Sequence, residues 1–167
     1  MSFVKTLRRE AVQWSALTAA LAFGWVGAAS AVEPLAFTDM DGRTHDGDAL
    51  IEDGTPVVLV FWQTWCGSCK REAPKLVEAV ERYGESLKFF GIISGPDDAV
   101  DDANVARVAR EWHLEHPQIR DRDLTLTKRY KVVGTPAIIV VGRGGKTLFS
   151  GHRLPEDWTQ FIETPKG

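Results

Sequence analysis

The sequence has no surplus of basic residues. Its 167 residues contain 20 Lys and Arg against 23 Asp and Glu, so the formal net charge is -3. Proteins that bind nucleic acid neutralise phosphates with clustered Lys and Arg, and we therefore expect no nucleic-acid partner. Internal repeats and segments typical of disorder are also lacking. With 44% hydrophobic residues, the chain suits one globular domain with a sizeable core.

Residues 1–31 differ in composition from the rest of the chain. A short basic start precedes a largely apolar run over residues 11–29, which ends in the tripeptide ASA. This order is typical of a secretory signal peptide, so we predict cleavage after Ala31 and a mature domain over residues 32–167. The apolar run is only about as long as a bilayer requires, which leaves an uncleaved membrane anchor as the alternative.

Two segments near the start of this domain predict β-structure. Residues 36–40 and 43–45 flank Asp41-Gly42, a dipeptide that favours a tight turn, which predicts a short hairpin. The run PVVLVFW over residues 56–62 has no alternation of apolar and polar side chains. A strand that is buried on both faces has this composition, so the run predicts the central strand.

Strands and helices alternate after the central strand. Helices are predicted over residues 67–83, 98–112, 124–130 and 155–162, and strands over residues 87–93, 137–141 and 146–150. This alternation places parallel neighbours in one sheet. The predicted fold is α/β, a mixed central sheet flanked by helices on both faces, with an N-terminal hairpin and no linker that would separate two domains.

Cysteine is scarce, and the only two, Cys66 and Cys69, lie close together in FWQTWCGSCKRE. A structural disulfide is the ordinary role in an exported protein, but so short a loop removes little entropy from the unfolded chain. A structural zinc site needs four ligands. His113 and His116 are the only close histidine pair, and their spacing is tighter than usual, so we expect no metal. A redox centre is the favoured interpretation.

The position of the pair supports redox chemistry. A buried strand is predicted to end just before Cys66, and a helix begins there, where free N–H groups and the helix dipole favour a thiolate. We predict that Cys66 is the exposed nucleophile. Cys69, shielded one turn later, would attack the mixed disulfide and release the substrate. No cofactor beyond this pair is expected.

Two motifs resemble those of a known superfamily. The segment VVLVFWQTWCGSCKREAPKL and the later Gly134-Thr135-Pro136 are similar to the thioredoxin superfamily. Within it, they resemble the TlpA/ResA-like group of membrane-anchored or periplasmic bacterial thiol-disulfide oxidoreductases. The likeness covers residues 35–163. It implies a thioredoxin fold with a cis proline at Pro136, beside the active site.

The resemblance also implies roles for single residues. Thr135, before the cis Pro136, would offer its backbone to an extended substrate strand, and Trp65 would cover the disulfide with an apolar face. Glu72 stands where the group keeps a glutamate near the active site, and it would tune the cysteines or take a proton from Cys69. The alternatives are a Trp65 that simply packs and a Glu72 that is simply solvated.

The sequence departs from ordinary thioredoxins at two points. Val60 occupies the position of their buried acid, so a proton acceptor must come from elsewhere, which favours Glu72. The dipeptide Gly67-Ser68 lacks the histidine found between the cysteines of strong periplasmic oxidants. This absence favours a reductant.

The predicted function is that of a periplasmic thiol-disulfide oxidoreductase that reduces protein disulfides. The resemblance implies a specific substrate, either the haem-binding cysteines of apocytochrome c or a partner in copper-site assembly. A membrane protein would have to donate the electrons, because an oxidised periplasm cannot recharge a reductase. Two alternatives stay open: a net oxidant or isomerase of secreted proteins, and a dithiol module that handles Cu(I) without disulfide turnover.

Overall fold

The computed structural model describes residues 35–162. In chain order the elements are β1 (Ala36–Thr38), β2 (Thr44–Asp46), α1 (Gly47–Glu52), β3 (Val57–Phe61), α2 (Gly67–Tyr83), β4 (Lys88–Ser94), α3 (Asp102–Glu111), β5 (Gln118–Asp121), α4 (Thr125–Arg129), β6 (Ala137–Gly142) and β7 (Lys146–Gly151). The predicted signal peptide over residues 1–31 lies outside this range. Within the range, no helix is both long and apolar enough to cross a membrane.

The main sheet has five strands in the order β5-β4-β3-β6-β7. The strand β3 pairs in parallel with β4, which pairs in parallel with β5. On its other edge β3 pairs antiparallel with β6, and β6 pairs antiparallel with β7. The prediction of a mixed sheet with residues 56–62 at its centre is therefore confirmed.

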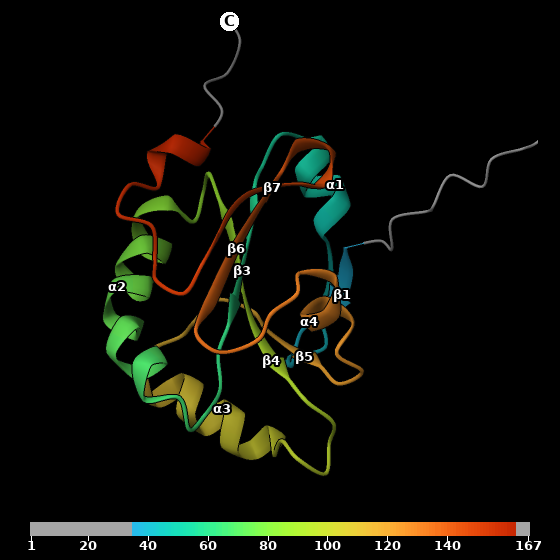
Figure 1. Cartoon of the computed structure of the whole chain (residues 1–167), viewed down its shortest axis with the longest axis vertical. Helices are drawn as coiled ribbons and strands as arrows, with labels where there is room; N and C mark the ends of the chain where they lie inside the picture. The colour runs from blue at the N-terminus through green and yellow to red at the C-terminus, as the bar shows by residue number, and fades with distance from the viewer. Residues whose placement is uncertain (1–34, 163–167) are drawn as a thin grey trace, which may run out of the picture. The chain divides into compact units, whose positions relative to one another are not determined.

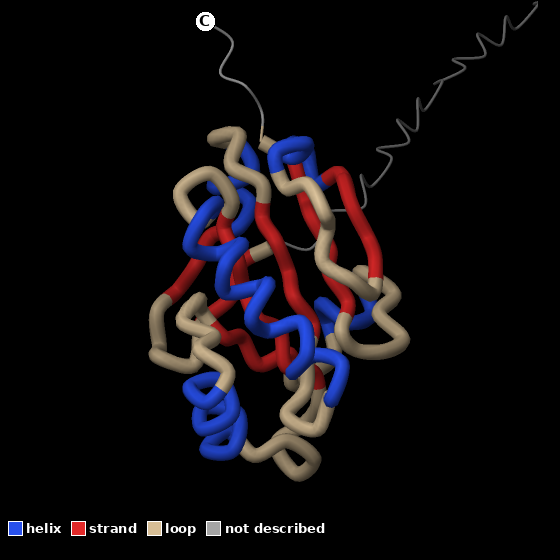
Figure 2. Tube along the Cα trace, turned by 90° about the vertical axis from the view of Figure 1, so that its left-hand side faces the viewer, coloured by secondary structure: helices blue, strands red, loops and turns tan. Residues whose placement is uncertain are grey.

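Alternate residues of β3 point to opposite faces of the sheet, and both faces are buried. Val58 and Val60 join an apolar cluster to which α2 and α3 contribute, whereas Leu59 and Phe61 join a second cluster to which α1 and α4 contribute. Figure 1 shows these two helix layers on either side of the sheet, and Figure 2 shows α2 lying across the strands. Helices therefore cover both faces, as predicted.

The predicted N-terminal hairpin forms a separate two-stranded sheet of β1 and β2. Gly42 sits in its turn with a φ of 83°, a conformation that glycine adopts without steric cost. The buried Asp39 organises the turn, because its carboxylate accepts hydrogen bonds from the backbone N–H groups of Asp41 and Arg43, both at 2.9 Å. It also pairs with Nε2 of His45 at 2.7 Å.

The prediction of a helix over residues 155–162 is wrong. Only a single 3-10 turn forms there, at Thr159–Phe161. Asp157 starts this turn, since its carboxylate accepts a hydrogen bond from the amide two residues later at 2.8 Å, a local bond that competes with an α-helix. Trp158 and Phe161 are buried, so two aromatic anchors hold the segment in place of helical hydrogen bonds.

The start of α3 and two short elements also differ from the prediction. The helix begins at Asp102 and not at residue 98, because the side chain of Asp101 caps it by accepting a hydrogen bond from Ala103 N at 3.0 Å. The short elements α1 and β5 were not predicted. β5 has the sequence QIRD and buries Arg120 and Asp121, so it lacks the apolar run by which a buried strand is recognised.

Candidate functional site: a dithiol at a helix start

The two cysteines form a disulfide, with an S–S distance of 1.99 Å, directly after the central strand. β3 ends at Phe61, and α2 begins at Gly67, so Cys66 occupies the N-cap of α2. Its sulfur accepts a hydrogen bond from the N–H of Cys69 at 3.1 Å. In the reduced protein a thiolate at Cys66 would face this same amide and the positive end of the helix dipole, both of which favour the charged sulfur.

Cys66 was predicted to be exposed, but in this disulfide form it is buried, as Cys69 is. Cys66 is 7% exposed and Cys69 is 6% exposed, because both belong to the apolar cluster on the α2 face of the sheet. The two sulfur-bearing residues differ in their surroundings. Cys66 lines an open hollow of about 230 Å³, whereas Cys69 lines a much smaller apolar cavity deeper in the fold.

Trp65 lies at the open hollow next to Cys66 and is 70% exposed. The alternative that this tryptophan simply packs in the core does not hold. The opposite wall of the hollow comes from α3, through Arg107 and Glu111, and from Trp112, which follows the helix. An exposed indole beside a disulfide offers apolar surface to a partner protein at the point where its own cysteine must approach.

The peptide bond between Thr135 and Pro136 is cis, as the resemblance implied. Pro136 directly precedes β6, and the first residue of β6, Ala137, pairs with Phe61 at the end of β3. This register brings the loop before β6 to the same end of the sheet as the cysteines. Pro136 accordingly lines the small cavity that also contains Cys69.

His152 supports this loop and was not predicted. Its Nδ1 lies 2.8 Å from the carbonyl oxygen of Pro136, within hydrogen-bonding distance. The outer side of the loop is open, since Gly134 is exposed and Val133 is 92% exposed. A histidine in an irregular segment after β7 gives no periodic signal, and its role depends on a contact between residues far apart in the sequence.

Glu72 lies in the first turns of α2 and lines the small apolar cavity beside Cys69. Its side chain is 26% exposed and lies 3.8 Å from Nζ of Lys75. Val60 lines the same cavity and supplies no charge. Within residues 35–162, Glu72 is the acidic side chain that lines this cavity together with Cys69.

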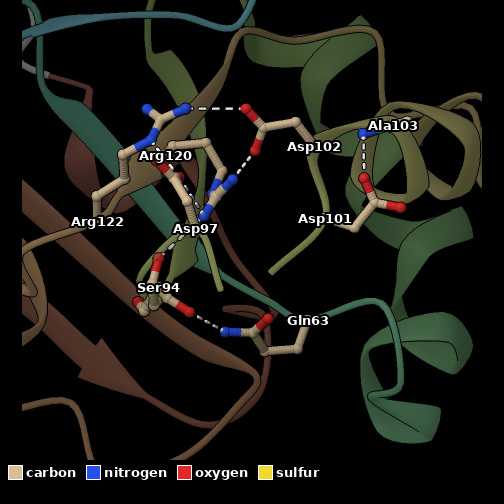
Figure 3. Close-up of polar contacts among 9 residues, drawn as sticks. Gln63, Ser94, Asp97, Asp101, Asp102, Ala103, Arg120 and Arg122 are labelled. Atoms are coloured by element: carbon tan, nitrogen blue, oxygen red, sulfur yellow. Dashed lines mark hydrogen bonds and ion pairs between the residues drawn. The ribbon is translucent and has the colours of Figure 1, made fainter. Parts of the chain in front are cut away.

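Gln63 ties the loop before the cysteines to the neighbouring strand. Its side-chain amide donates to the carbonyl oxygen of Ser94, at the end of β4, at 2.7 Å, and Figure 3 shows this bond. The carbonyl oxygen of Gln63 accepts from the N–H of Cys66 at 3.0 Å. The glutamine is 7% exposed and thus fixes the position of Cys66 from inside the fold.

A charge network holds the segment between β4 and α3 (Figure 3). Arg120, whose side chain is 1% exposed, forms ion pairs with Asp97 and Asp102 and donates to the carbonyl oxygen of Gly95 at 2.9 Å. Arg122 bonds to the same two carboxylates, at 2.6 Å and 2.8 Å. Asp97 and Asp102, two acidic residues of this segment, are thus bound to arginines of β5 and of the segment after it.

The described part of the chain contains no group of three or more His, Cys, Asp or Glu side chains that could hold a metal ion. His113 is exposed, whereas His116 is buried, and burial lowers the pKa of His116 to about 4. Both histidines line a groove between α2 and residues 111–116, not the cavities that the cysteines line.

A disulfide at the start of a helix, beside a cis proline on a five-stranded mixed sheet, defines a thioredoxin-fold dithiol protein. Comparison with known proteins agrees with this class. Residues 29–149 match the AhpC/TSA family. The thiol-disulfide oxidoreductase ResA of Bacillus thuringiensis subsp. konkukian is 28% identical over 130 residues, which cover 75% of this chain and 71% of ResA.

Two mycobacterial proteins are similar as well. The soluble secreted antigen MPT53 of Mycobacterium tuberculosis is 31% identical over 139 residues, covering 80% of this chain and 76% of MPT53. The solved structure of a secreted Mycobacterium tuberculosis disulfide oxidoreductase homologous to E. coli DsbE has a TM-score of 0.60 at 25% identity, over 74% of this chain and 85% of that one. The chain therefore belongs to the AhpC/TSA family, as a thiol-disulfide oxidoreductase of the TlpA/ResA-like group.

Proposed function

We propose that this protein is a reductase of protein disulfides that works outside the cytoplasm. The observation that carries the proposal is the Cys66–Cys69 pair at the N-terminus of α2, next to the loop of Pro136. Its relatives include proteins described as secreted, and residues 1–31 have the composition of an export signal. The dithiol itself carries the electrons, so the proposed reaction needs no bound cofactor.

The reaction proceeds in two exchanges. The thiolate of Cys66 attacks one sulfur of the substrate disulfide, which forms a mixed disulfide and releases the other substrate sulfur as a thiolate that takes up a proton. Cys69 then loses its proton and attacks the sulfur of Cys66. The intramolecular disulfide re-forms, and the second substrate thiol leaves. The substrate gains two electrons and two protons, and the dithiol loses them.

In this proposal Thr135 and Trp65 contact the substrate beside Pro136, and Glu72 accepts a proton. The backbone of Thr135 pairs with an extended substrate strand beside Pro136, while the exposed indole of Trp65 packs against apolar side chains next to the substrate cysteine. Glu72 accepts the proton of Cys69 during the second exchange, because it is the carboxylate that lines the cavity of that cysteine.

The proposed substrate is a specific disulfide formed during cytochrome c maturation or copper-site assembly, and a membrane protein returns the electrons. This finer assignment rests on the resemblance to the TlpA/ResA-like group and on Gly67-Ser68, which places no histidine between the cysteines. A general oxidant would need a dithiol whose reduced form is strongly stabilised. Here the groups within hydrogen-bonding distance of the Cys66 sulfur are one backbone amide, at 3.1 Å, and the hydroxyl of Ser68, at 3.5 Å.

The reduction potential of the Cys66/Cys69 couple tests the direction of electron flow. The protein would be equilibrated with dithiothreitol or glutathione buffers, and free thiols would be trapped and counted. A potential near that of thioredoxin, about -270 mV, is the expected result for a reductase. A potential near about -120 mV, as in strong oxidants, would make disulfide formation the function instead. Tight Cu(I) binding with negligible thiol exchange would replace both with a copper-handling role.

A further inference from the structure

An open apolar groove runs between α2 and residues 111–116, with a volume of about 520 Å³. Pro74, Val77 and Val80 form the α2 wall, and Trp112 lies on the other side. Pro74 is exposed, and the two valines are only half-buried, so these side chains present apolar surface to solvent. The volume lies within the range of about 300–1,000 Å³ that is usual for ligand sites.

The groove is continuous with the disulfide site. Lys70, Glu111 and Trp112 line both this groove and the hollow that contains Trp65 and Cys66. Nζ of Lys70 and the carboxylate of Glu111 lie 3.4 Å apart, and both side chains are about half exposed or more. An ion pair as exposed as this one is weak. It therefore lies at the boundary between the two hollows but does not block the passage from one to the other.

Two acidic side chains line the groove without a basic partner. Glu81 lies near the end of α2, away from the disulfide, and Glu115 lies in the segment after α3; both are exposed, and neither forms an ion pair with any residue in the range 35–162. Near the disulfide, by contrast, Glu111 is neutralised by Lys70 and by Arg107 at 3.1 Å. Along the groove, the surface therefore changes from neutral to apolar and then to negative.

We propose that this groove binds the polypeptide segment next to the reacting cysteine of the substrate protein, and that it selects apolar side chains followed by a basic one. The inference rests on the proposed function, since it assumes a protein disulfide as substrate. Distances along α2 give the register. Val77 lies about 16 Å and Glu81 about 22 Å beyond Cys66 at the rise of a helix. An extended segment covers these distances in about five and seven residues.

Peptides that carry one cysteine as a mixed disulfide with a chromophoric thiol test this inference. The first peptide has leucine at the fourth and fifth positions from the cysteine and lysine at the seventh. It is synthesised in two versions, one with these residues on the C-terminal side of the cysteine and one with them on the N-terminal side. In matched peptides serine replaces the leucines, or glutamate replaces the lysine. The full-length protein is reduced beforehand, and its Cys66 thiolate releases the chromophore as it attacks the peptide sulfur. A small mixed disulfide without a peptide reports the intrinsic reactivity.

The expected result is an exchange rate constant about tenfold higher for the leucine-lysine peptide than for its serine counterpart in one chain direction. Val77→Lys should remove this preference and leave the rate with the small disulfide unchanged. Leu148→Lys is the matched control, because Leu148 is a 40% exposed apolar residue of β7 that does not line the groove. It should behave as the wild type does.

A double charge reversal gives a second, independent test that does not alter the apolar wall. In Glu81→Lys/Glu115→Lys both changes are at exposed positions, so folding should be retained. The preference should shift from the lysine peptide to the glutamate peptide. Equal rates for all peptides in the wild type, or a preference that both sets of variants retain, would overturn the inference.

Two further outcomes distinguish this inference from a failure of the proposed function and from self-association of the protein. Failure of the reduced protein to react even with the small disulfide would overturn the proposed function itself and not the groove alone. A dimer in solution that Val77→Lys dissociates would assign the groove to a second copy of this chain, and it would overturn the substrate assignment. Sedimentation analysis of both proteins decides this point.

Discussion

The folded protein favours the neutral form of the His116 imidazole. It is 7% exposed, and its Nε2 has no hydrogen-bond partner among residues 35–162. Burial lowers its pKa from 6.5 to about 4. Between these two values the unfolded chain binds a proton at His116 that the folded protein does not bind. The free energy of unfolding must therefore fall as the pH falls from about 6.5 towards about 4.

The magnitude follows from the two pKa values. At pH 5, protonation of His116 favours the unfolded state by about 2 kcal/mol, whereas at pH 7 the same ionisation contributes only about 0.2 kcal/mol. Below about pH 4 both states bind the proton, so the decrease in the free energy of unfolding that His116 causes levels off at about 3 kcal/mol. Most of the effect thus lies in a range where the carboxylates with ordinary pKa values are still charged.

Guanidinium denaturation of the oxidised full-length protein at pH 7 and pH 5 measures this contribution. His116→Leu removes the ionisation, so the variant should lose about 2 kcal/mol less than the wild type between the two pH values. His113→Asn is the control: His113 is exposed, and asparagine tolerates its positive φ of 57°. A wild-type pH dependence in His116→Leu would refute the reasoning.

Three further predictions concern the hairpin and the dithiol. Asp39→Asn should lower the free energy of unfolding in guanidinium by about 1–3 kcal/mol, because it removes a buried carboxylate that pairs with His45 and holds the turn. Glu72→Gln should slow the release of reduced peptide by about tenfold or more in stopped-flow assays, since Cys69 loses its proton acceptor. Trp65→Ala should change stability by less than about 0.5 kcal/mol but lower kcat/KM severalfold for protein disulfides and not for small ones.

The parts of the fold that were predictable have a strong local pattern. Residues 56–62 are apolar throughout because β3 is buried on both faces, and α2 spans Gly67–Tyr83, the same residues as the predicted helix. The dithiol was equally visible, since its cysteines lie within one helical turn of each other. Where a single segment forms the secondary structure and also carries the reactive side chains, its sequence is sufficient to predict both.

The remaining features depend on contacts between distant segments. β5 is a strand because its backbone pairs with β4, although its side chains include the buried Arg120 and Asp121. The contact of His152 with Pro136 and the small difference in exposure between the cysteines arise in the same way. No property of the local sequence encodes the packing that brings these groups together.

The charge network and the groove are connected through α3. Arg120 and Arg122 bind Asp102, the first residue of α3, whereas the other end of that helix delivers Glu111 and, just beyond it, Trp112 to the disulfide site. A helix of this length spans about 15 Å. In this network only Arg120 is buried, at 1% exposure of its side chain, whereas Asp97, Asp102 and Arg122 are about half exposed or more. The arginines of β5 and of the segment after it thus hold the first residue of the helix whose other end lines the disulfide site.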